Sequence, residues 1–493
     1  MKKLLFAFGF VMGISISATH GQAVSAKTKI QVNPLYVQSR LEGIGASWHS
    51  ESLDKIDESP EYKWAYRYKN SRGSAWGGNP PVTHEAGWKK VSDYASWLGM
   101  SWVSVELSAR MYEPEKGMFD WENEEMLALY KILDWAQKNN ATVFLRQMWA
   151  NVKWNSYPGV QPLMSAPKSV DDFANGLATL IDHLLNVKKY TCIKWLCISN
   201  EPPAWWNKGD EEVSITPALK AVRAALDQRS VSLQISGPDW TELPRFDAGR
   251  IDFNEYIGAY DIHIYGALDS AREIILSDWV KWANTHQKPL FLSEMGNMAL
   301  GWQDENPGPK SFNAAISNVE TILKGLEAGV SGFSRWSYTN RGDLDGQWQL
   351  IHTWDRQNKQ YLKEVTIEPA AFYGFGIITR FCAKNSDVVK TTKTGSPKIL
   401  SQSIKSPTGK ITTYILNLSD QPESIEYELL GKPALPLYLY KASEAEVTQP
   451  DYKMEGQKMV LQESGVLSIQ IPARSIYSLS QYKLRHKDPG VKR

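Results

Sequence analysis

Eight short apolar segments recur between residues 41 and 338, and they constrain the fold more than any other feature of the sequence. Each ends in polar or aromatic residues, and most are followed by the pattern of an amphipathic helix. Their hydrophobicity is continuous rather than alternating, which is typical of strands buried on both faces, as in a parallel sheet. The segments are LEGIGASWHS (41–50), SWVSVELSAR (101–110), ATVFLRQMWAN (141–151), IKWLCISNEP (193–202), SLQISGPDW (232–240), AYDIHIYG (259–266), PLFLSEMG (289–296) and SGFSRWSY (331–338).

Helical patterns lie between these segments, at 122–139, 169–186 and 310–329. In the last of them, Ser311 is available as a cap and Gly329 as a stop. Eight units of strand then helix over about 300 residues predict a (β/α)8 TIM barrel of the α/β class. An open doubly wound sheet is the alternative, but no glycine-rich phosphate loop follows the first strand.

A different pattern begins after about residue 363, where short strands are separated by Gly, Pro and Asp turns. The segments at 411–419, 424–431, 435–442, 465–473 and 475–484 predict a β-sandwich, to which residues 28–34 could add a strand. The apolar stretch AAFYGFGIITRF (370–381) is expected to pack against both parts, and the basic tail RHKDPGVKR is expected to be disordered. We therefore expect a signal peptide at 1–23, a catalytic barrel at 24–362, a sandwich at 363–485 and a tail at 486–493.

The N-terminus has the pattern of a secretory signal peptide. Lys2 and Lys3 precede an apolar run that extends to about Ile16, and small residues follow before Ala23. The run is too short for a stable transmembrane helix, and no other apolar stretch approaches 18 residues. We expect export to the periplasm or the medium. Cys192, Cys197 and Cys382 are expected to be buried free thiols, since the first two lie too close together along one extended segment to form a disulfide easily.

Composition excludes some partners and favours another. A formal net charge of +1 gives no support for nucleic acid or an anionic membrane. The chain carries 20 Trp and 22 Tyr, and an exposed indole face stacks well on a sugar ring. Five tryptophans at strand ends or in loops are candidates for sugar stacking, with core packing as the alternative for each: Trp48, Trp149, Trp205, Trp240 and Trp336.

Two carboxylates end barrel strands and are the candidates for chemistry. Glu201 follows the fourth strand in ISNEPPAWW, and Glu294 ends the seventh in PLFLSEMG. In a parallel barrel both open onto one rim. Cleavage of a glycosidic bond needs such a pair, one protonated to assist the leaving oxygen and the other ionised to attack the anomeric carbon. Glu106 and Asp239 also end strands, and could either pair with Arg110 or Arg146 or contact substrate.

Taken together, these stretches resemble clan A of the glycoside hydrolases, the retaining (β/α)8 enzymes. The resemblance covers residues 41–340 and rests on Asn200-Glu201-Pro202, His263-Ile264-Tyr265 and Ser293-Glu294 in this order and spacing. It implies that Glu201 is the acid/base and Glu294 the nucleophile. It also implies that Asn200 contacts the sugar 2-hydroxyl, Tyr265 bonds Glu294, His263 sits beside the pair and Trp336 forms a sugar platform.

Within the clan, LEGIGASW, the β-rich C-terminus and FYGFGIITRF (372–381) are similar to family 30, whereas RMYEPEKGMFDWEN (110–123) is more similar to families 39 and 42. Clan members often place an arginine near the nucleophile, and Arg110 and Arg146 are both candidates because both end strands.

We expect an exported, monomeric retaining β-glycoside hydrolase that needs no metal or cofactor and cleaves a neutral β-glucan or β-galactan internally. The alternatives are an exo-β-glycosidase or transglycosylase of the same clan and a non-catalytic carbohydrate-binding protein. A metal-dependent barrel hydrolase is disfavoured because it needs a His-x-His pair, whereas residues 263–265 are His-Ile-Tyr. The segment Asp343-x-Asp345-Gly346 does not fit a calcium loop, since Trp348 and Trp354 occupy the sixth and twelfth positions.

Overall fold

The computed structural model of the protein describes residues 27–50, 78–149, 152–160, 162, 164–202, 206–209, 211–241, 246–297, 308–339, 348–355, 358, 360–431, 436–459 and 466–491. Three features expected from the sequence lie outside these residues. They are the signal peptide, most of the first long loop and the Asp343-x-Asp345 segment.

Eight strands of the described chain close into a barrel, and every neighbouring pair is parallel. They coincide with the eight apolar segments, so the predicted (β/α)8 architecture is confirmed and the open sheet is excluded. The strands β2, β3 and β10 are buried along their whole length, which explains their continuous hydrophobicity. In chain order the barrel strands are β2 (Gly43–His49), β3 (Trp102–Ser108), β4 (Thr142–Trp149), β5 (Ile193–Cys197), β8 (Gln234–Trp240), β9 (Ala259–Tyr265), β10 (Leu290–Gly296) and β11 (Gly332–Arg335).

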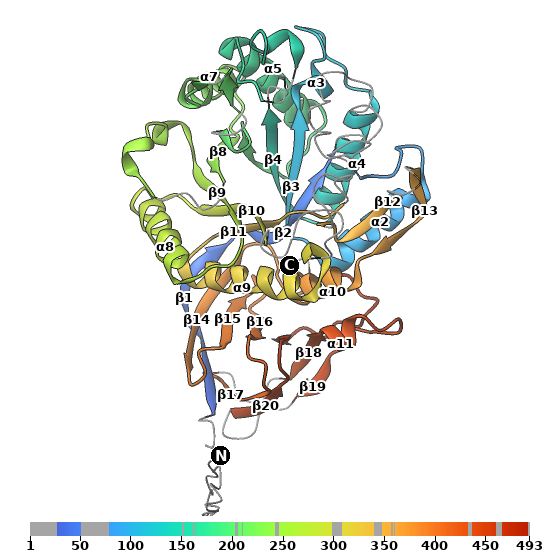
Figure 1. Ribbon diagram of the computed structural model, residues 1–493, viewed down its shortest axis with the longest axis vertical. Coiled ribbons are helices and arrows are strands. Elements are labelled where there is room, and N and C mark those ends of the chain that lie inside the picture. Colours follow the sequence, from blue (N-terminus) through green and yellow to red (C-terminus); the bar gives the residue numbers. More distant parts are fainter. Residues whose placement is uncertain are drawn as a thin grey trace, which may run out of the picture.

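Helices surround the barrel, and the three strongest helical patterns in the sequence all form (Figure 1). At the start of α9 the Ser311 side chain accepts a hydrogen bond from the backbone N–H of Ala314, and the helix ends at Gly329 with a φ of +107°. These are the predicted cap and stop. The main helices are α2 (Glu85–Leu98), α4 (Glu124–Lys138), α5 (Val170–Asp182), α7 (Thr216–Gln228), α8 (Ser270–Thr285), α9 (Phe312–Ala328) and α10 (Pro369–Thr379), with a short α3 (Ala109–Tyr112) after β3.

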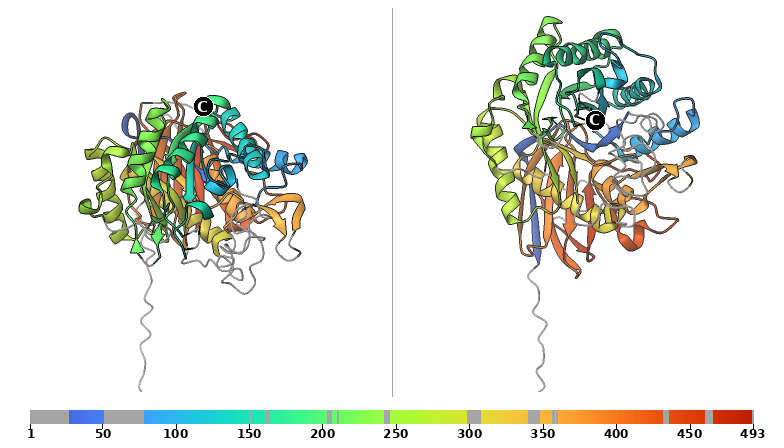
Figure 2. Two further views of the ribbon diagram at one scale, coloured as in Figure 1. Left: turned by 90° about the horizontal axis from the view of Figure 1, so that it is seen from above. Right: turned by 45° about the horizontal axis from the view of Figure 1, so that its top comes forward.

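The C-terminal strands form a second β structure on one side of the barrel (Figures 1 and 2). Within the described residues it is one nine-stranded sheet, whose strands from both ends share one apolar cluster, as in a sandwich. The first strand of the chain, β1 (Thr28–Leu41), lies inside this sheet between β14 and β17. The other strands are β14 (Ser386–Thr394), β15 (Ile399–Lys405), β16 (Ile411–Asn417), β17 (Glu423–Leu429), β18 (Leu437–Ser443), β19 (Gln457–Met459), β20 (Val466–Ile471) and β21 (Ser475–Ser480).

Helix α10 joins the two parts, as the apolar 370–381 stretch predicts. Its residues 370–372 and 374–379 are buried. The Ser478 hydroxyl of β21 donates to the Ile377 carbonyl at 2.6 Å, and the Tyr414 hydroxyl of β16 donates to the Ile378 carbonyl at 3.1 Å. Figure 1 shows α9 and α10 between the barrel and the C-terminal sheet. The sheet is therefore attached to the barrel through a buried helix.

Residues 486–491 of the tail pack against the rest of the protein, contrary to the expectation of disorder. The backbone N–H of Gly490 donates to the Ser96 carbonyl at 3.0 Å, and that of Val491 donates to the Arg380 carbonyl at 2.8 Å. Gly490 lies directly against Gly99, so close that a Cβ on either glycine would clash with the other. The basic composition of the segment suggested solvation, but the contact between two glycines holds the tail against α2.

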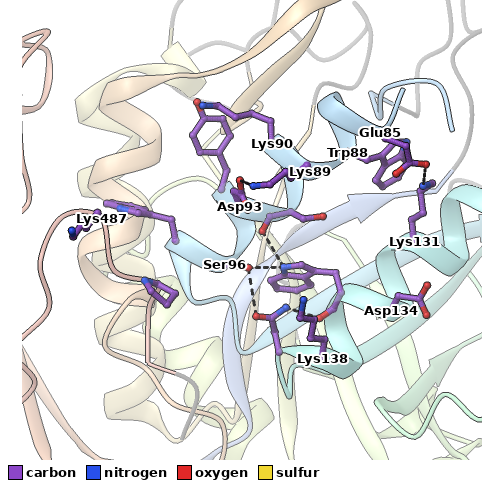
Figure 3. Close-up of a pocket in the computed structure, with 16 residues that line it drawn as sticks. Glu85, Trp88, Lys89, Lys90, Asp93, Ser96, Lys131, Asp134, Lys138 and Lys487 are labelled. Carbon is purple, nitrogen blue, oxygen red and sulfur yellow. Dashed lines mark hydrogen bonds and ion pairs between the residues drawn. The ribbon is translucent and has the colours of Figure 1, made fainter. Parts of the chain in front are cut away.

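A cavity of about 760 Å³ lies between α2, α4 and this tail, on the outer wall of the barrel (Figure 3). Lysines and acids share its lining, and four of them form two ion pairs, Lys89–Asp93 at 2.6 Å and Lys131–Glu85 at 2.8 Å. Neither Glu201 nor Glu294 lines it. The large cavity is therefore separate from the predicted chemistry.

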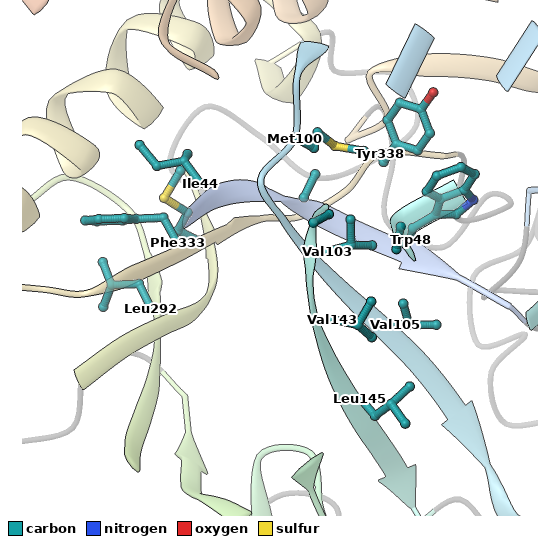
Figure 4. Close-up of a cluster of buried hydrophobic side chains, with 14 of the residues drawn as sticks. Ile44, Trp48, Met100, Val103, Val105, Val143, Leu145, Leu292, Phe333 and Tyr338 are labelled. Carbon is teal, nitrogen blue, oxygen red and sulfur yellow. The ribbon is translucent and has the colours of Figure 1, made fainter. Parts of the chain in front are cut away.

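The interior of the barrel is filled by rings from strands that are not neighbours, and Phe291 of β10 contacts Trp102 of β3 and Trp195 of β5. The alternate strand residues Ile44, Val103, Val143 and Leu292 belong to the larger apolar cluster that the strands share with the helices (Figure 4). The three cysteines are buried and free, as expected from their spacing. None of the helices in the described chain is long and apolar enough to cross a membrane.

Candidate active site

The two predicted catalytic glutamates lie at the carboxyl end of the barrel. Glu201 follows β5 by four residues, and Glu294 lies near the end of β10. The Glu294 side chain is 5% exposed and that of Glu201 is 18% exposed. One carboxylate is therefore nearly sealed in protein, whereas the other retains some contact with solvent.

His263 of β9 lies between the two glutamates. Its Nδ1 is 2.8 Å from Glu201 Oε1 and 3.3 Å from Glu294 Oε2. One oxygen of each carboxylate and one nitrogen of this ring all lie within 4.8 Å of one another. The structure thus brings together the three residues that the sequence placed on strands four, six and seven.

Glu294 is held by two further side chains. The Tyr265 hydroxyl donates to Oε2 at 2.5 Å, and the guanidinium of Arg146 donates to Oε1. Arg146 also donates through Nη2 to the Ser293 carbonyl at 3.0 Å. Both oxygens of Glu294 therefore have protein donors, which fix the direction of its carboxylate.

Arg110 and Arg146 were both candidates for the place beside Glu294, and Arg146 is the one that contacts it. Arg110 lies in α3 and makes a two-fold ion pair with Glu125 of α4, at 2.7 and 2.9 Å. Asn200 is 6% exposed, and its amide oxygen has no hydrogen-bond partner within the described residues. The contact between Asn200 and the sugar 2-hydroxyl that the resemblance implies stays a prediction.

Two more strand ends contribute buried carboxylates around Arg146. Glu106 of β3 lies 3.5 Å from Arg146 Nη1, and Asp239 of β8 lies 3.4 Å from Nη2. Glu106 also pairs with His49 of β2. The sequence left open whether Glu106 and Asp239 bind arginine or substrate, and both contact Arg146.

These contacts shift the pKa values of the site in opposite directions. Burial raises the pKa of Glu294 to about 7, against the lowering effects of His263 and Arg146. The pKa of Glu201 is lowered, because the hydrogen bond and charge of His263 outweigh burial. Burial opposes the charged form of His263, but Glu294 and Asp239 raise its pKa well above the ordinary value. In the free protein the imidazolium of His263 therefore faces an ionised Glu201.

The predicted sugar-stacking tryptophans whose side chains are described are all buried. Trp336 follows β11, is 2% exposed and lies edge-on to His49 with ring centroids 4.8 Å apart. Trp48 and Trp240 lie in the main apolar core. Trp48 is fully buried beside Tyr338, and Trp240 is 6% exposed and packs edge-on to Trp279. Trp205 and the side chain of Trp149 lie outside the described part of the chain.

Sequence reasoning missed two polar residues behind the glutamates, His49 and Asp261. Both lie on barrel strands and are fully buried, His49 beside Glu106 and Asp261 beside Asp239. Asp261 accepts hydrogen bonds from the Ser236 hydroxyl and the Asp239 backbone N–H, both at 2.8 Å. The available signal was a polar residue inside an otherwise apolar strand, which is costly unless it is hydrogen-bonded.

Among the described residues, two groups of side chains have the spacing to hold a cation. They are Glu201, His263 and Glu294 and, behind them, Cys197, Asp239 and Asp261. In the first group, both nitrogens of His263 face carboxylates and both oxygens of Glu294 accept protein hydrogen bonds. The adjacent guanidinium of Arg146 adds a positive charge that opposes a metal ion. The donor set therefore fits proton transfer better than metal binding.

Solved structures with a similar fold are known. The parallel eight-stranded barrel with its attached β-sandwich resembles in fold the structures of clan A glycoside hydrolases, among them family 30. No family model matches the sequence, and no curated protein matches it.

Three solved structures illustrate the resemblance in fold. The catalytic domain of the family 30 xylanase C from Talaromyces cellulolyticus aligns with a TM-score of 0.63 at 13% identity, over 92% of this chain and 99% of that chain. A conserved exported protein from Bacteroides fragilis gives 0.65 at 13% identity, over 92% and 99% of the two chains. An endo-β-1,6-glucanase gives 0.63 at 12% identity, over 92% and 94%. The resemblance to the clan is thus confirmed at the level of the fold.

Proposed function

We propose that the protein is a retaining β-glycoside hydrolase that works by double displacement. The observation that carries the proposal is the spacing around His263, where an oxygen of Glu201 and an oxygen of Glu294 lie within 4.8 Å of each other. Retaining enzymes hold their two carboxyl groups about 5–5.5 Å apart, whereas inverting enzymes leave about 6.5–9.5 Å for a water molecule. The short separation favours direct attack by a carboxylate.

In the proposed first step, Glu294 attacks the anomeric carbon while Glu201 gives its proton to the departing glycosidic oxygen. The carbon–oxygen bond to the leaving group breaks, and an ester forms to Glu294. In the second step Glu201 takes a proton from water, the water oxygen attacks the anomeric carbon, and Glu294 leaves as a carboxylate. Arg146 and Tyr265 hold Glu294 throughout, since they bond its two different oxygens.

Glu201 must be protonated before the first step, although it is ionised in the free protein. Its side chain still contacts solvent, and a bound sugar ring removes that contact. Desolvation raises the pKa of a carboxyl group. The Nδ1 proton of His263, 2.8 Å away, can then move to Glu201 Oε1. Nδ1 takes in exchange the proton that Glu294 holds below about pH 7, because Glu294 Oε2 lies 3.3 Å from it, and Glu294 is left as the ionised nucleophile. The structure thereby offers a proton source beside the proposed acid.

The proposed substrate is a neutral β-linked glucan or galactan that is cleaved internally. Clamping a sugar carboxylate needs a free cationic group, but Arg110 is paired with Glu125 and Arg146 with Glu106, Asp239 and Glu294. The net charge of +1 gives no field that collects acidic polymers. A xylanase and an endo-β-1,6-glucanase among the structural neighbours carry names that denote action on polymers.

Export and a monomeric state are parts of the same proposal. The signal-peptide pattern at the N-terminus supports export, and one structural neighbour is described as an exported protein. The alternatives within the clan are an exo-β-glycosidase and a transglycosylase, which use the same covalent intermediate.

The test is a screen of purified protein against β-glucans, galactans, mannans and xylans, followed by proton NMR of the first product. We expect a β-anomer as the first product and a mixture of oligosaccharides from a polymer. An α-anomer would exclude double displacement on a β-linkage. Release of monosaccharide alone at all times would favour the exo-glycosidase, and activity only on glucuronosyl-containing chains would contradict the neutral substrate.

A further inference from the structure

Asp239, at the carboxyl end of β8, contacts most of the groups that hold the two glutamates. Its Oδ1 accepts a hydrogen bond from His263 Nε2 at 3.0 Å and one from the Ser293 hydroxyl at 3.2 Å. The same oxygen lies 3.4 Å from Arg146 Nη2. The side chain is fully buried, so these contacts are made without competition from water.

The backbone of Asp239 also holds Glu201 directly. The Asp239 carbonyl accepts the backbone N–H of Glu201 at 3.1 Å, and its own N–H donates to Asp261 Oδ1 at 2.8 Å. Glu201 and Asp239 both have a left-handed backbone, with φ of +42° and +59°. Such conformations cost about 1–3 kcal/mol each in a non-glycine residue and persist where the surrounding structure imposes them. Here one backbone hydrogen bond joins the two strained residues.

The two hydrogen bonds of the His263 ring explain why residue 239 should carry a negative charge. Nε2 faces Asp239, while Nδ1 faces both glutamates, so a ring that donates in both directions must carry two protons. A neutral imidazole has one N–H and can donate in one direction only. The carboxylate of Asp239 stabilises the doubly protonated ring that the arrangement around Glu201 needs.

We propose that Asp239 is a positioning residue, which fixes His263, Arg146 and the Glu201 backbone so that the two glutamates keep the separation needed for catalysis. Asp239 contacts neither glutamate side chain in the described structure and acts through these neighbours. The proposal rests on the proposed function, in which Glu201 and Glu294 are the reacting groups.

The decisive variant is Asp239→Asn, because Asn tolerates a left-handed backbone and keeps an oxygen acceptor while the charge is lost. We expect kcat to fall about 100-fold, as for loss of a general acid–base arrangement, with KM within about threefold of the original value. Asp239→Gly, which also permits the backbone but removes the side chain, should lower kcat further. Ser293→Ala removes one neutral donor to Oδ1 and should have a smaller effect than either. Asp93→Asn, at the exposed pair with Lys89, is the matched control for loss of an Asp charge and should leave kcat unchanged.

A second measurement tests the role of Asp239 through the protonation of His263 and does not depend on activity. In protein labelled with ¹⁵N-histidine, the ring of His263, assigned through a His263→Asn variant, should carry two protons at pH 7. In Asp239→Asn its titration midpoint should fall by at least one pH unit. A merely structural Asp239 would lower the melting temperature and leave this midpoint in place.

Three results would overturn the proposal. They are a neutral His263 in the wild-type protein at pH 7, an unchanged His263 midpoint in a folded Asp239→Asn variant, and a kcat within threefold of wild type in that variant. If the wild-type protein cleaves no glycan, the proposed function fails, while the NMR arm still reports whether Asp239 holds the His263 ring. If Asp239→Asn does not fold, the state of His263 in the wild-type protein decides.

Discussion

Arg146 and Glu294 form a buried ion pair across the barrel, between β4 and β10. The Arg146 side chain is fully buried and that of Glu294 is 5% exposed. The same guanidinium lies 3.5 Å from Glu106 and 3.4 Å from Asp239. One cation therefore balances three carboxylates that burial would otherwise make very costly.

Replacement of Arg146 should distinguish the effect of its hydrogen-bond geometry from the effect of its positive charge. Arg146→Lys keeps a positive charge but cannot bond Glu294 and the Ser293 carbonyl through one planar group. We expect kcat/KM to fall about 100-fold, a loss of about 2.7 kcal/mol of transition-state stabilisation, with a small change in melting temperature. Arg146→Met leaves the buried carboxylates unpaired and should cost about 3–5 kcal/mol of stability.

The control for this pair of variants is Arg223→Lys, because Arg223 pairs with Asp227 on the outer helix α7. Steady-state kinetics and thermal unfolding of the three variants provide the comparison. Wild-type kinetics in Arg146→Lys would show that the direction of the Glu294 carboxylate is not set by this arginine.

The rate should depend on pH through the coupled pair Glu201 and Glu294. Catalysis needs one proton on the pair, and the upper limit of that range is set by Glu294, whose pKa burial raises to about 7. Above pH 7 the pair loses its last proton, so kcat/KM should decline as the pH rises. The argument holds whichever glutamate carries the proton in the free protein, because the observed values belong to the pair.

A pH profile of kcat/KM on a substrate without ionisable groups measures this limit. Full activity at pH 9 would contradict a pKa near 7 for the pair. The profile should be recorded alongside thermal unfolding, so that loss of fold at high pH is not mistaken for titration.

Stability should depend on pH through Asp261. Burial and the charge of Asp239 raise the pKa of Asp261 to about 7 from an ordinary value of 3.8. The native state therefore holds a proton that the unfolded state has released between these values. The contribution is fully present below about pH 4 and is lost as the pH rises to about 7, at up to about 1.4 kcal/mol per pH unit.

Asp261→Asn imitates the protonated carboxyl and cannot lose this proton. We expect the unfolding free energy of the variant to change less between pH 4 and 7 than that of the wild-type protein, as measured by urea unfolding. Asp252→Asn, near the surface, is the control. Equal pH dependence in the wild-type protein and Asp261→Asn would show that Asp261 is already ionised in the folded state.

The sequence predicted the barrel well because its signal is local. Each strand is a continuous apolar run, and this pattern results directly from burial on both faces. The meeting of Glu201, His263 and Glu294 was also predictable, since parallel strand ends share one rim. The exact partners of Arg146 were not, because the choice between Glu106, Asp239 and substrate depends on side-chain directions that no local pattern encodes.

The tryptophans also show that a local sequence pattern does not predict side-chain directions. Trp48 lies in a strand that is buried on both faces, so its position in the sequence does not reveal whether its ring faces the core or the rim. Its indole N–H donates to Asn79 at 2.7 Å, a contact that follows only from the fold. The tail was misjudged for a related reason, since the approach of Gly490 to Gly99 joins residues nearly 400 positions apart.

The roles of the two glutamates can be distinguished by leaving-group chemistry. Glu294→Gln should abolish activity on every substrate, because no nucleophile remains. Glu201→Ala should retain cleavage of aryl glycosides with acidic leaving groups, since such groups depart without a proton. Azide should restore turnover in Glu201→Ala and yield a β-glycosyl azide. Equal losses on aryl glycosides and natural glycans, with no azide rescue, would contradict this assignment.

The division proposed at residue 362 predicts that the barrel does not stand alone. A chain that ends there lacks β14 and β17, the two neighbours between which β1 is held. It also lacks α10, which is buried between the barrel and the sheet. Ile30 and Val32 of β1, fully buried in the complete protein, would face solvent at a cost of about 1.5–3 kcal/mol each.

We therefore expect the 1–362 fragment to be insoluble or much less stable than the complete chain. Co-expression with residues 363–493 should restore soluble protein, because the fragment supplies both partners of β1. A second fragment, 42–362, distinguishes loss of the β1 partners from loss of α10, since it removes the unpaired strand but leaves the α10 surface uncovered. If α10 is the essential contact, this shorter fragment is also unstable. A soluble and fully active 1–362 fragment would show instead that the C-terminal sheet is an independent appendage.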